Sequence, residues 1–128
     1  MRCMSASINK VILIVEPDTN FREELYNFLL SAGYENVDSV ESFEQSLKRI
    51  EESCYDVVIS DASVGPTDVL SFARAVTRIR PGSEVILMIT PESQKEWNGQ
   101  ARNTGEFQCV VKTTFARNLL YLLEYRSV

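Results

Sequence analysis

The sequence contains no histidine among its 128 residues. This absence excludes Ser-His and Cys-His nucleophilic catalysis, zinc sites with a histidine ligand, and the H-E-x-x-H metal site. It also means that the chain cannot carry a phosphohistidine of its own. Several large enzyme classes are thereby removed before any motif is considered.

Cysteine, glycine, proline and clusters of basic residues are also scarce. The three cysteines, Cys3, Cys54 and Cys109, form no C-x-x-C pair, which argues against a disulfide framework and fits a reducing, cytosolic setting. Five glycines and four prolines are typical neither of disorder nor of a fibrous repeat. The formal net charge is −5 and no block of Lys or Arg occurs, so we expect no direct binding to nucleic acid.

Long hydrophobic runs are absent as well. The longest are only about five residues, as at positions 11–15, so we expect no signal peptide and no membrane span. Yet 45% of the residues are apolar, which is enough for one domain of this length to bury a core without a disulfide or a metal.

Five short apolar runs, rich in β-branched residues, alternate with segments of helical spacing. The runs are 11–15, 37–40, 55–59, 85–89 and 107–111. Three of them are continuously apolar, which is typical of strands covered on both faces in a parallel sheet. Strands that alternate with helices imply βαβ crossovers, so we predict an α/β fold with a five-stranded parallel sheet, doubly wound. We expect residues 1–9 to be a loose lead-in to a single domain over residues 10–128.

Apolar stripes predict four helices, and polar side chains predict where two of them begin. The stripes lie within residues 21–29, 43–50, 69–76 and 115–123. Two segments fit the capping box, with Asn20 and Ser42 as the capping residues. The polar segment 91–104 is a poorer candidate, for which we expect only a short or loose helix with a partly exposed Trp97.

Polar side chains stand directly after four of the predicted strands. They are Glu16-Pro17-Asp18 after the first, Ser60 to Ser63 after the third, Thr90 after the fourth and Lys112 after the fifth. Ligands of open parallel sheets bind at the carboxyl ends of the strands, so these groups should converge there. The first loop is acidic and no Gly-rich phosphate loop occurs, so a phosphate would need a bridging cation. Oxygen ligands of this kind suit magnesium.

These segments resemble the receiver domain of response regulators in two-component signalling. The resemblance runs from about residue 10 to residue 124 and is strongest in 12–18, 55–61, 85–90 and 110–112. The intervals between Glu16, Asp61, Thr90 and Lys112 are 45, 29 and 22 residues, which is similar to the spacing in that family. The resemblance implies a flavodoxin-like receiver fold. It also implies a signalling domain rather than an enzyme, with at most self-catalysed phosphoryl transfer and hydrolysis.

The resemblance also implies roles for individual residues. Asp61 takes the place of the phosphoacceptor, whose carboxylate attacks a phosphohistidine on a partner. Glu16, Asp61 and the backbone carbonyl of Ser63 take the places of the Mg²⁺ ligands. Thr90 and Lys112 take the places of the two residues that contact the phosphoryl group. The implied partner is a sensor histidine kinase or a phosphotransfer protein of a phosphorelay.

Several positions depart from the family pattern. Pro17 stands where a second acidic ligand of the metal usually lies, and it offers no side-chain oxygen. Asp18 either replaces that ligand or caps the following helix. Cys109 stands in place of the switch aromatic, so the usual coupling of Thr90 to that ring cannot operate. Pro91 and Thr113 also differ from the family.

Three functions remain open on the sequence. The first is a phosphoryl-accepting receiver, and the second is a pseudo-receiver that acts as a phosphorylation-independent interaction module. The third, a metal-dependent phosphatase, is the weakest because Ser63 stands where a second acid would be needed. The last helix is apolar beyond one stripe at 119–123, so the excess belongs either to the core or to a homodimer interface. We expect a cytoplasmic protein.

Overall fold

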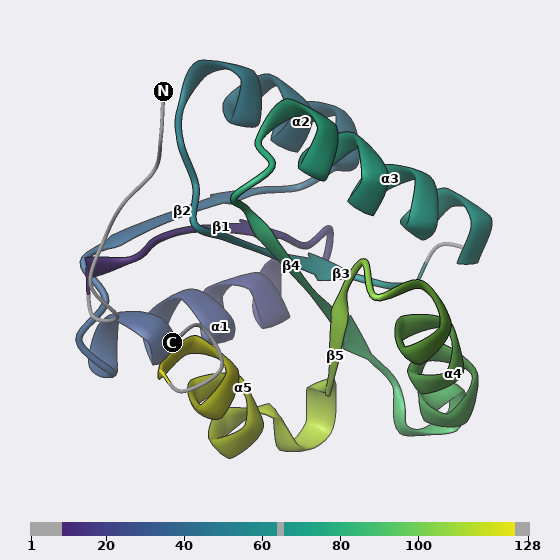
Figure 1. Ribbon diagram of the computed structural model, residues 1–128. Helices are drawn as coiled ribbons and strands as arrows, with labels where there is room; N and C mark the ends of the chain where they lie inside the picture. The colour runs from purple at the N-terminus through teal and green to yellow at the C-terminus, as the bar shows by residue number, and fades with distance from the viewer. Residues whose placement is uncertain (1–8, 64–65, 125–128) are drawn as a thin grey trace.

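The computed structural model describes residues 9–63 and 66–124, which form a five-stranded parallel sheet between two layers of helices (Figure 1). The strands are β1 (Val11–Val15), β2 (Asn36–Val40), β3 (Val57–Asp61), β4 (Glu84–Ile89) and β5 (Gln108–Val111). The helices are α1 (Thr19–Ser31), α2 (Phe43–Glu52), α3 (Pro66–Ile79), α4 (Gln94–Thr104) and α5 (Phe115–Glu124). The predicted α/β fold is thereby confirmed. Most of the expected lead-in, residues 1–8, lies outside the described residues.

The order of the strands in the sheet is β2-β1-β3-β4-β5. All four neighbouring pairs are parallel. β2 is therefore added on one side of β1, and β3, β4 and β5 are added in turn on the other side. The predicted third strand is shifted, because β3 begins two residues later than expected and runs on to Asp61.

Side chains of β1 alternate between two apolar cores, one on each face of the sheet. Leu13 and Val15 pack with residues of α2, α3 and α4, among them Ile50 and Phe72. Ile12 and Ile14 pack on the other face, where α1 and α5 supply residues such as Leu25, Leu29 and Leu119. Figure 1 shows the same division, with α1 and α5 on one side of the sheet. Burial on both faces explains why β1 is apolar at every position and why β3 and β4 are polar only at an end.

The first helix begins two residues earlier than the capping box predicted. Asp18 is the N-cap of α1, and its carboxylate accepts the backbone N–H of Phe21 at 2.9 Å. The prediction of Asn20 as the cap is wrong, because Asn20 already lies inside the helix. The prediction for α2 is confirmed, since Ser42 accepts the backbone N–H of Gln45.

The segment after β4 is more regular than the sequence indicated. A short 3₁₀ turn, η2 (Pro91–Ser93), leads into α4, which runs for 11 residues. The prediction of a short or loose helix is therefore wrong. So is the expected exposure of Trp97, which is only 4% exposed and packs edge-on against Phe107. Burial of the indole gives this otherwise polar helix an apolar anchor, and Gly105 ends it in the left-handed conformation.

The apolar residues of α5 belong mainly to the core. Leu119 and Leu123 are fully buried, and Leu120 and Leu122 pack against the same cluster. Tyr121 is the exception, with 57% of its surface exposed. Within the described ranges, no helix has both the length and the apolar character that crossing a membrane requires.

Candidate functional site

The carboxyl ends of β1 and β3 lie side by side at the point where the order of strands reverses. Val15 pairs in register with Ser60. The next residues on the two chain segments, Glu16 and Asp61, therefore lie beside each other at the edge of the sheet. Both carboxylates are deeply buried, with Glu16 2% and Asp61 6% exposed. In open α/β sheets this reversal point forms the ligand crevice. The topology therefore brings together two acidic residues that are 45 positions apart.

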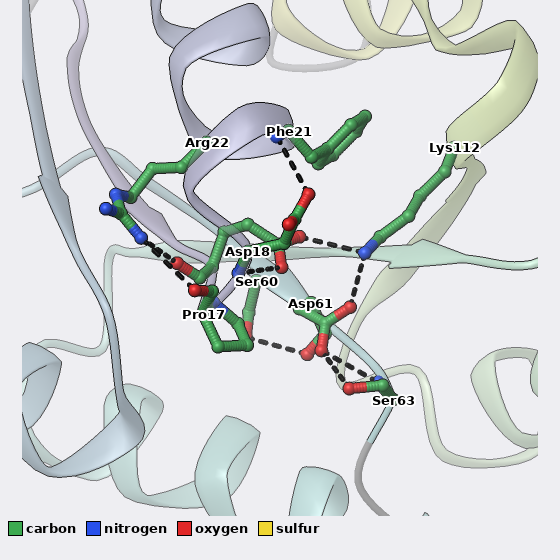
Figure 2. Close-up of polar contacts among 9 residues, drawn as sticks. Pro17, Asp18, Phe21, Arg22, Ser60, Asp61, Ser63 and Lys112 are labelled. Atoms are coloured by element: carbon green, nitrogen blue, oxygen red, sulfur yellow. Dashed lines mark hydrogen bonds and ion pairs between the residues drawn. The ribbon is translucent and has the colours of Figure 1, made fainter.

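The ammonium group of Lys112 contacts both carboxylates, and Figure 2 shows it beside Asp61. It begins the short turn η3 (Lys112–Thr114) directly after β5. Its Nζ lies 2.6 Å from Asp61 Oδ1 and 2.8 Å from Glu16 Oε1. The same Nζ lies 4.8 Å from the centre of the Phe21 ring, a cation–π contact. One positive charge is thus shared between two buried negative charges.

Ser63 is a second hydrogen-bond donor to Asp61 and favours its ionised form. The backbone N–H of Ser63 donates to Asp61 Oδ2 at 3.1 Å, and the Ser63 hydroxyl donates to the same oxygen. Burial by itself would raise the pKa of Asp61, but the hydrogen bonds from Lys112 and Ser63 outweigh it and hold the pKa below its ordinary value. Burial likewise opposes the charge on Lys112, yet the two carboxylates raise its pKa. At neutral pH, Asp61 is therefore ionised and lies beside a fixed cation.

The loop after β1 turns back on Glu16. Glu16 Oε2 accepts the backbone N–H of Asp18 at 3.0 Å, while Arg22 donates to the Glu16 carbonyl at 2.8 Å. Pro17 contributes no side-chain oxygen, and the Asp18 carboxylate caps α1 instead of facing Asp61. Of the two roles that the sequence left open for Asp18, the structure therefore shows the cap.

A hollow of about 370 Å³ opens beside Asp61. Asp61, Ser63, Thr90, Trp97 and Lys112 line it, with Glu96 and Ser93 of the following segment. Thr90 comes directly after β4, as predicted, but its hydroxyl contacts Ser93 Oγ at 2.9 Å. A larger hollow of about 600 Å³ lies near the amino ends of β4 and β5, away from these groups.

Cys109 does not line the hollow beside Asp61. It is half-buried in β5, and its thiol donates weakly to the carbonyl of Trp97 at 3.7 Å. Burial raises the pKa of Cys109 to about 11. The thiol is therefore neutral at physiological pH and packs as a small apolar group, as the sequence suggested.

Five residues at the site were not assigned to it from the sequence. Phe21 and Arg22 belong to the first turn of α1 and support Lys112 and the Glu16 loop. Ser93, Glu96 and Trp97 line the hollow from the segment after β4. Ser93 and Trp97 are one helical turn apart, which predicts that they lie on the same side of a helix. The spacing does not predict that this side lies next to Asp61.

The sequence matches the response regulator receiver domain family over residues 12–124. The chain belongs to this family. Members of it are signal receivers of two-component systems, so the domain is a signalling module rather than an enzyme of an ordinary class.

Solved structures agree with the fold. The chemotaxis response regulator CheY4 of Vibrio cholerae has a TM-score of 0.75 and 23% identity, with 94% of this chain and 99% of that chain covered. The receiver domain of a Pseudomonas aeruginosa sensor histidine kinase, which holds a magnesium ion in its active-site cleft, has a TM-score of 0.73 and 20% identity over 90% of this chain and 94% of its own. The response regulator TrrA from Thermotoga maritima, in complex with Mg²⁺ and BeF, has a TM-score of 0.68 and 27% identity, covering 86% of this receiver and 92% of TrrA.

The oxygen donors of the site match the ligand type that magnesium prefers, although they are few. Glu16 directly follows β1 and Asp61 ends the adjacent β3, so both offer hard carboxylate oxygens, and Mg²⁺ commonly completes its shell with water. Among the residues that the structure describes, no group of three or more His, Cys, Asp or Glu side chains is placed to hold a metal ion. Glu16 and Asp61 would therefore supply two carboxylate oxygens to a magnesium ion, and water would complete most of its shell.

Proposed function

We propose that this receiver domain accepts a phosphoryl group on Asp61 from a phosphohistidine of a sensor histidine kinase or phosphotransfer protein. The observation that carries the proposal is the placement of Asp61. Its carboxylate is ionised, buried to 6% exposure, and bound to Lys112 at 2.6 Å at the mouth of a hollow of about 370 Å³. No other described carboxylate combines these features. The 128 residues contain no histidine, so the phosphohistidine must lie outside them, and a small phosphorylated molecule is the other possible donor.

In the proposed transfer, a carboxylate oxygen of Asp61 attacks phosphorus and forms the O–P bond of an acyl phosphate. The N–P bond of the donor breaks, and its electron pair stays on the imidazole nitrogen, which is protonated from solvent. Lys112 holds its charge throughout, since its pKa is raised, and it can pair with a phosphoryl oxygen. Thr90 faces the same hollow and can donate a hydrogen bond once its hydroxyl leaves Ser93.

Magnesium belongs to this proposal as a weakly held cofactor. Glu16, Asp61 and the backbone carbonyl of Ser63 would hold it, and when bound it would offset the charge on the phosphoryl oxygens. Asp18 would not contribute, because its carboxylate is used to cap α1. Pro17 supplies no third carboxylate, so the affinity should lie below that of a site with a full acidic pair.

The second candidate, a pseudo-receiver that signals without phosphorylation, has one observation in its favour. The facing carboxylate oxygens already have donors from the protein. Lys112 contacts one oxygen of each acid, Asp18 N–H occupies the second of Glu16, and Ser63 occupies the second of Asp61. A metal or a phosphoryl group must displace some of these contacts, whereas an interaction module would need none of them broken.

Intact-mass spectrometry distinguishes the two candidates. The protein would be incubated with acetyl phosphate and Mg²⁺, with and without a chelator. We expect a Mg²⁺-dependent phosphoryl adduct that is lost in Asp61→Asn and retained in the matched control Asp68→Asn, whose aspartate is exposed on α3. Absence of an adduct, under conditions that label an established receiver, would refute the phosphoacceptor proposal and favour the pseudo-receiver.

A further inference from the structure

We propose that Ser93 is a positioning residue that holds Thr90 away from the phosphoryl site, and that Trp97, one helical turn further on, reports its release. This inference rests on the proposed function of Asp61. It concerns the coupling of the Thr90 hydroxyl to the rest of the domain. In the family an aromatic residue takes part in this coupling, and this chain has Cys109 in its place. The segment from Thr90 to Trp97 connects the hollow directly to α4.

Ser93 contacts both the hydroxyl and the carbonyl of Thr90. Ser93 Oγ donates to the Thr90 carbonyl at 3.1 Å and also lies 2.9 Å from Thr90 Oγ1. A serine hydroxyl has a single proton, so when that proton goes to the carbonyl, Thr90 must be the donor in the hydroxyl pair. Thr90 can then donate to a phosphoryl oxygen only after its contact with Ser93 breaks.

Breaking this contact loosens the start of α4. Ser93 N–H also donates to the Thr90 carbonyl at 3.2 Å, so the two residues are joined by three contacts across the turn η2. Ser93 is the residue immediately before α4, and its side chain is turned back to Thr90 and makes no capping hydrogen bond to that helix. A movement of Thr90 toward Asp61 therefore passes to the first turn of α4.

Trp97 is placed to follow that movement. It is one turn after Ser93, lines the same hollow as Asp61 and Thr90, and is only 4% exposed. Its ring packs on Phe107, with centroids 5.9 Å apart, and its carbonyl accepts the Cys109 thiol. Cys109 is small, so it places no aromatic ring near the hollow. The indole of Trp97 is the aromatic side chain that lines it. A shift of α4 would change how far the indole is exposed.

The test uses beryllium fluoride with Mg²⁺ as a stable mimic of the phosphoryl group. Its binding is measured by ¹⁹F NMR, and the exposure of Trp97 by acrylamide quenching of fluorescence, which is unambiguous because the chain has one tryptophan. We expect quenching of Trp97 to change with the same midpoint as binding. Ser93→Ala should bind the mimic roughly two- to fivefold more tightly, since it loses the exposed contacts of the Ser93 hydroxyl with Thr90 that favour the free state. Ser71→Ala, an exposed serine on α3, should bind like the parent.

The outcomes separate this inference from the function on which it rests. A merely structural role for Ser93 predicts weaker binding in Ser93→Ala, because damage to η2 would disorder the site. Equal or weaker binding in that variant overturns the inference, as does binding without any change in the quenching of Trp97, and both results leave Asp61 as the acceptor. Failure of the parent protein to bind the mimic at all overturns both proposals.

Discussion

Replacing Lys112 by methionine tests how the buried charges are held together. Methionine keeps much of the length of the side chain but removes the ammonium group that lies 2.6 Å from Asp61 and 2.8 Å from Glu16. The two carboxylates would remain buried next to each other without their shared cation. Such a change is costly because an uncompensated buried charge has lost its solvation without gaining a partner.

The expected loss of unfolding free energy at pH 7 is about 3 kcal/mol. Breaking a fully buried ion pair typically costs roughly 3–5 kcal/mol, and a hydrogen bond to a charged group contributes about 1.5–3 kcal/mol. The side chain of Lys112 is 23% exposed, so water relieves part of the penalty and the lower end applies. The loss is large compared with the roughly 5–15 kcal/mol by which domains are stable.

The same change has a defined pH dependence. The folded-state pKa of Asp61 is lowered, so its stabilising effect is complete above its unfolded value of about 3.9 and is lost as pH falls through the folded value. Without Lys112, burial becomes the dominant influence and the pKa of Asp61 rises. The stability difference between the parent and the variant should therefore be largest at neutral pH and shrink below about pH 4.

Urea unfolding followed by far-UV circular dichroism at pH 7 and at about pH 3.5 measures both effects. Lys48→Met is the matched control, because Lys48 is an exposed lysine on α2 and its loss should change stability by less than about 0.5 kcal/mol. Equal stability of Lys112→Met and the parent at pH 7 would refute the reasoning. A stability difference between the parent and Lys112→Met that grows as the pH falls would refute the assignment of the loss to the charge of Asp61.

Three further predictions concern the metal, the first helix and the last helix. Pro17→Asp places a third carboxylate beside the site and should tighten Mg²⁺ binding about tenfold or more by calorimetry, a result that unchanged affinity would contradict. Asp18→Ala should cost about 1 kcal/mol of stability through loss of the α1 cap while leaving Mg²⁺ affinity unchanged, with Asp18→Asn as the cap-preserving control; weaker Mg²⁺ binding in both variants would instead make Asp18 a ligand. If α5 forms a homodimer, Tyr121→Ser should weaken it in sedimentation velocity experiments, and a parent protein that stays monomeric at high concentration would exclude that interface.

The strands were predictable because burial on both faces leaves a local signature. Continuous runs such as 11–15 and 85–89 need no distant information to be recognised, and the parallel sheet follows from their alternation with helices. The site residues were predictable for a related reason. In a parallel sheet the carboxyl ends of all strands share one edge, so the residue after each strand is a candidate wherever the strands are found.

The errors at α1 and α4 arose where local signals competed or were weak. Both Asp18 and Asn20 are good capping residues, and the choice of Asp18 follows from where β1 ends and how the chain turns after Pro17. The helix α4 is polar enough that its sequence favoured a loose segment. Burial of Trp97 against Phe107 stabilises it, a contact between residues on different elements that no local pattern reveals.

The sequence by itself determined the family, the sheet, and the identities of Asp61, Glu16, Thr90 and Lys112. Only the tertiary structure decided how these groups are partnered. Lys112 lies between two carboxylates that are 51 and 96 residues away along the chain, while Thr90 turns to Ser93. Residue types and spacing specify which groups reach one edge of the sheet. The donors that each one meets there depend on distances of a few ångströms, which are set by packing of the helices on both faces.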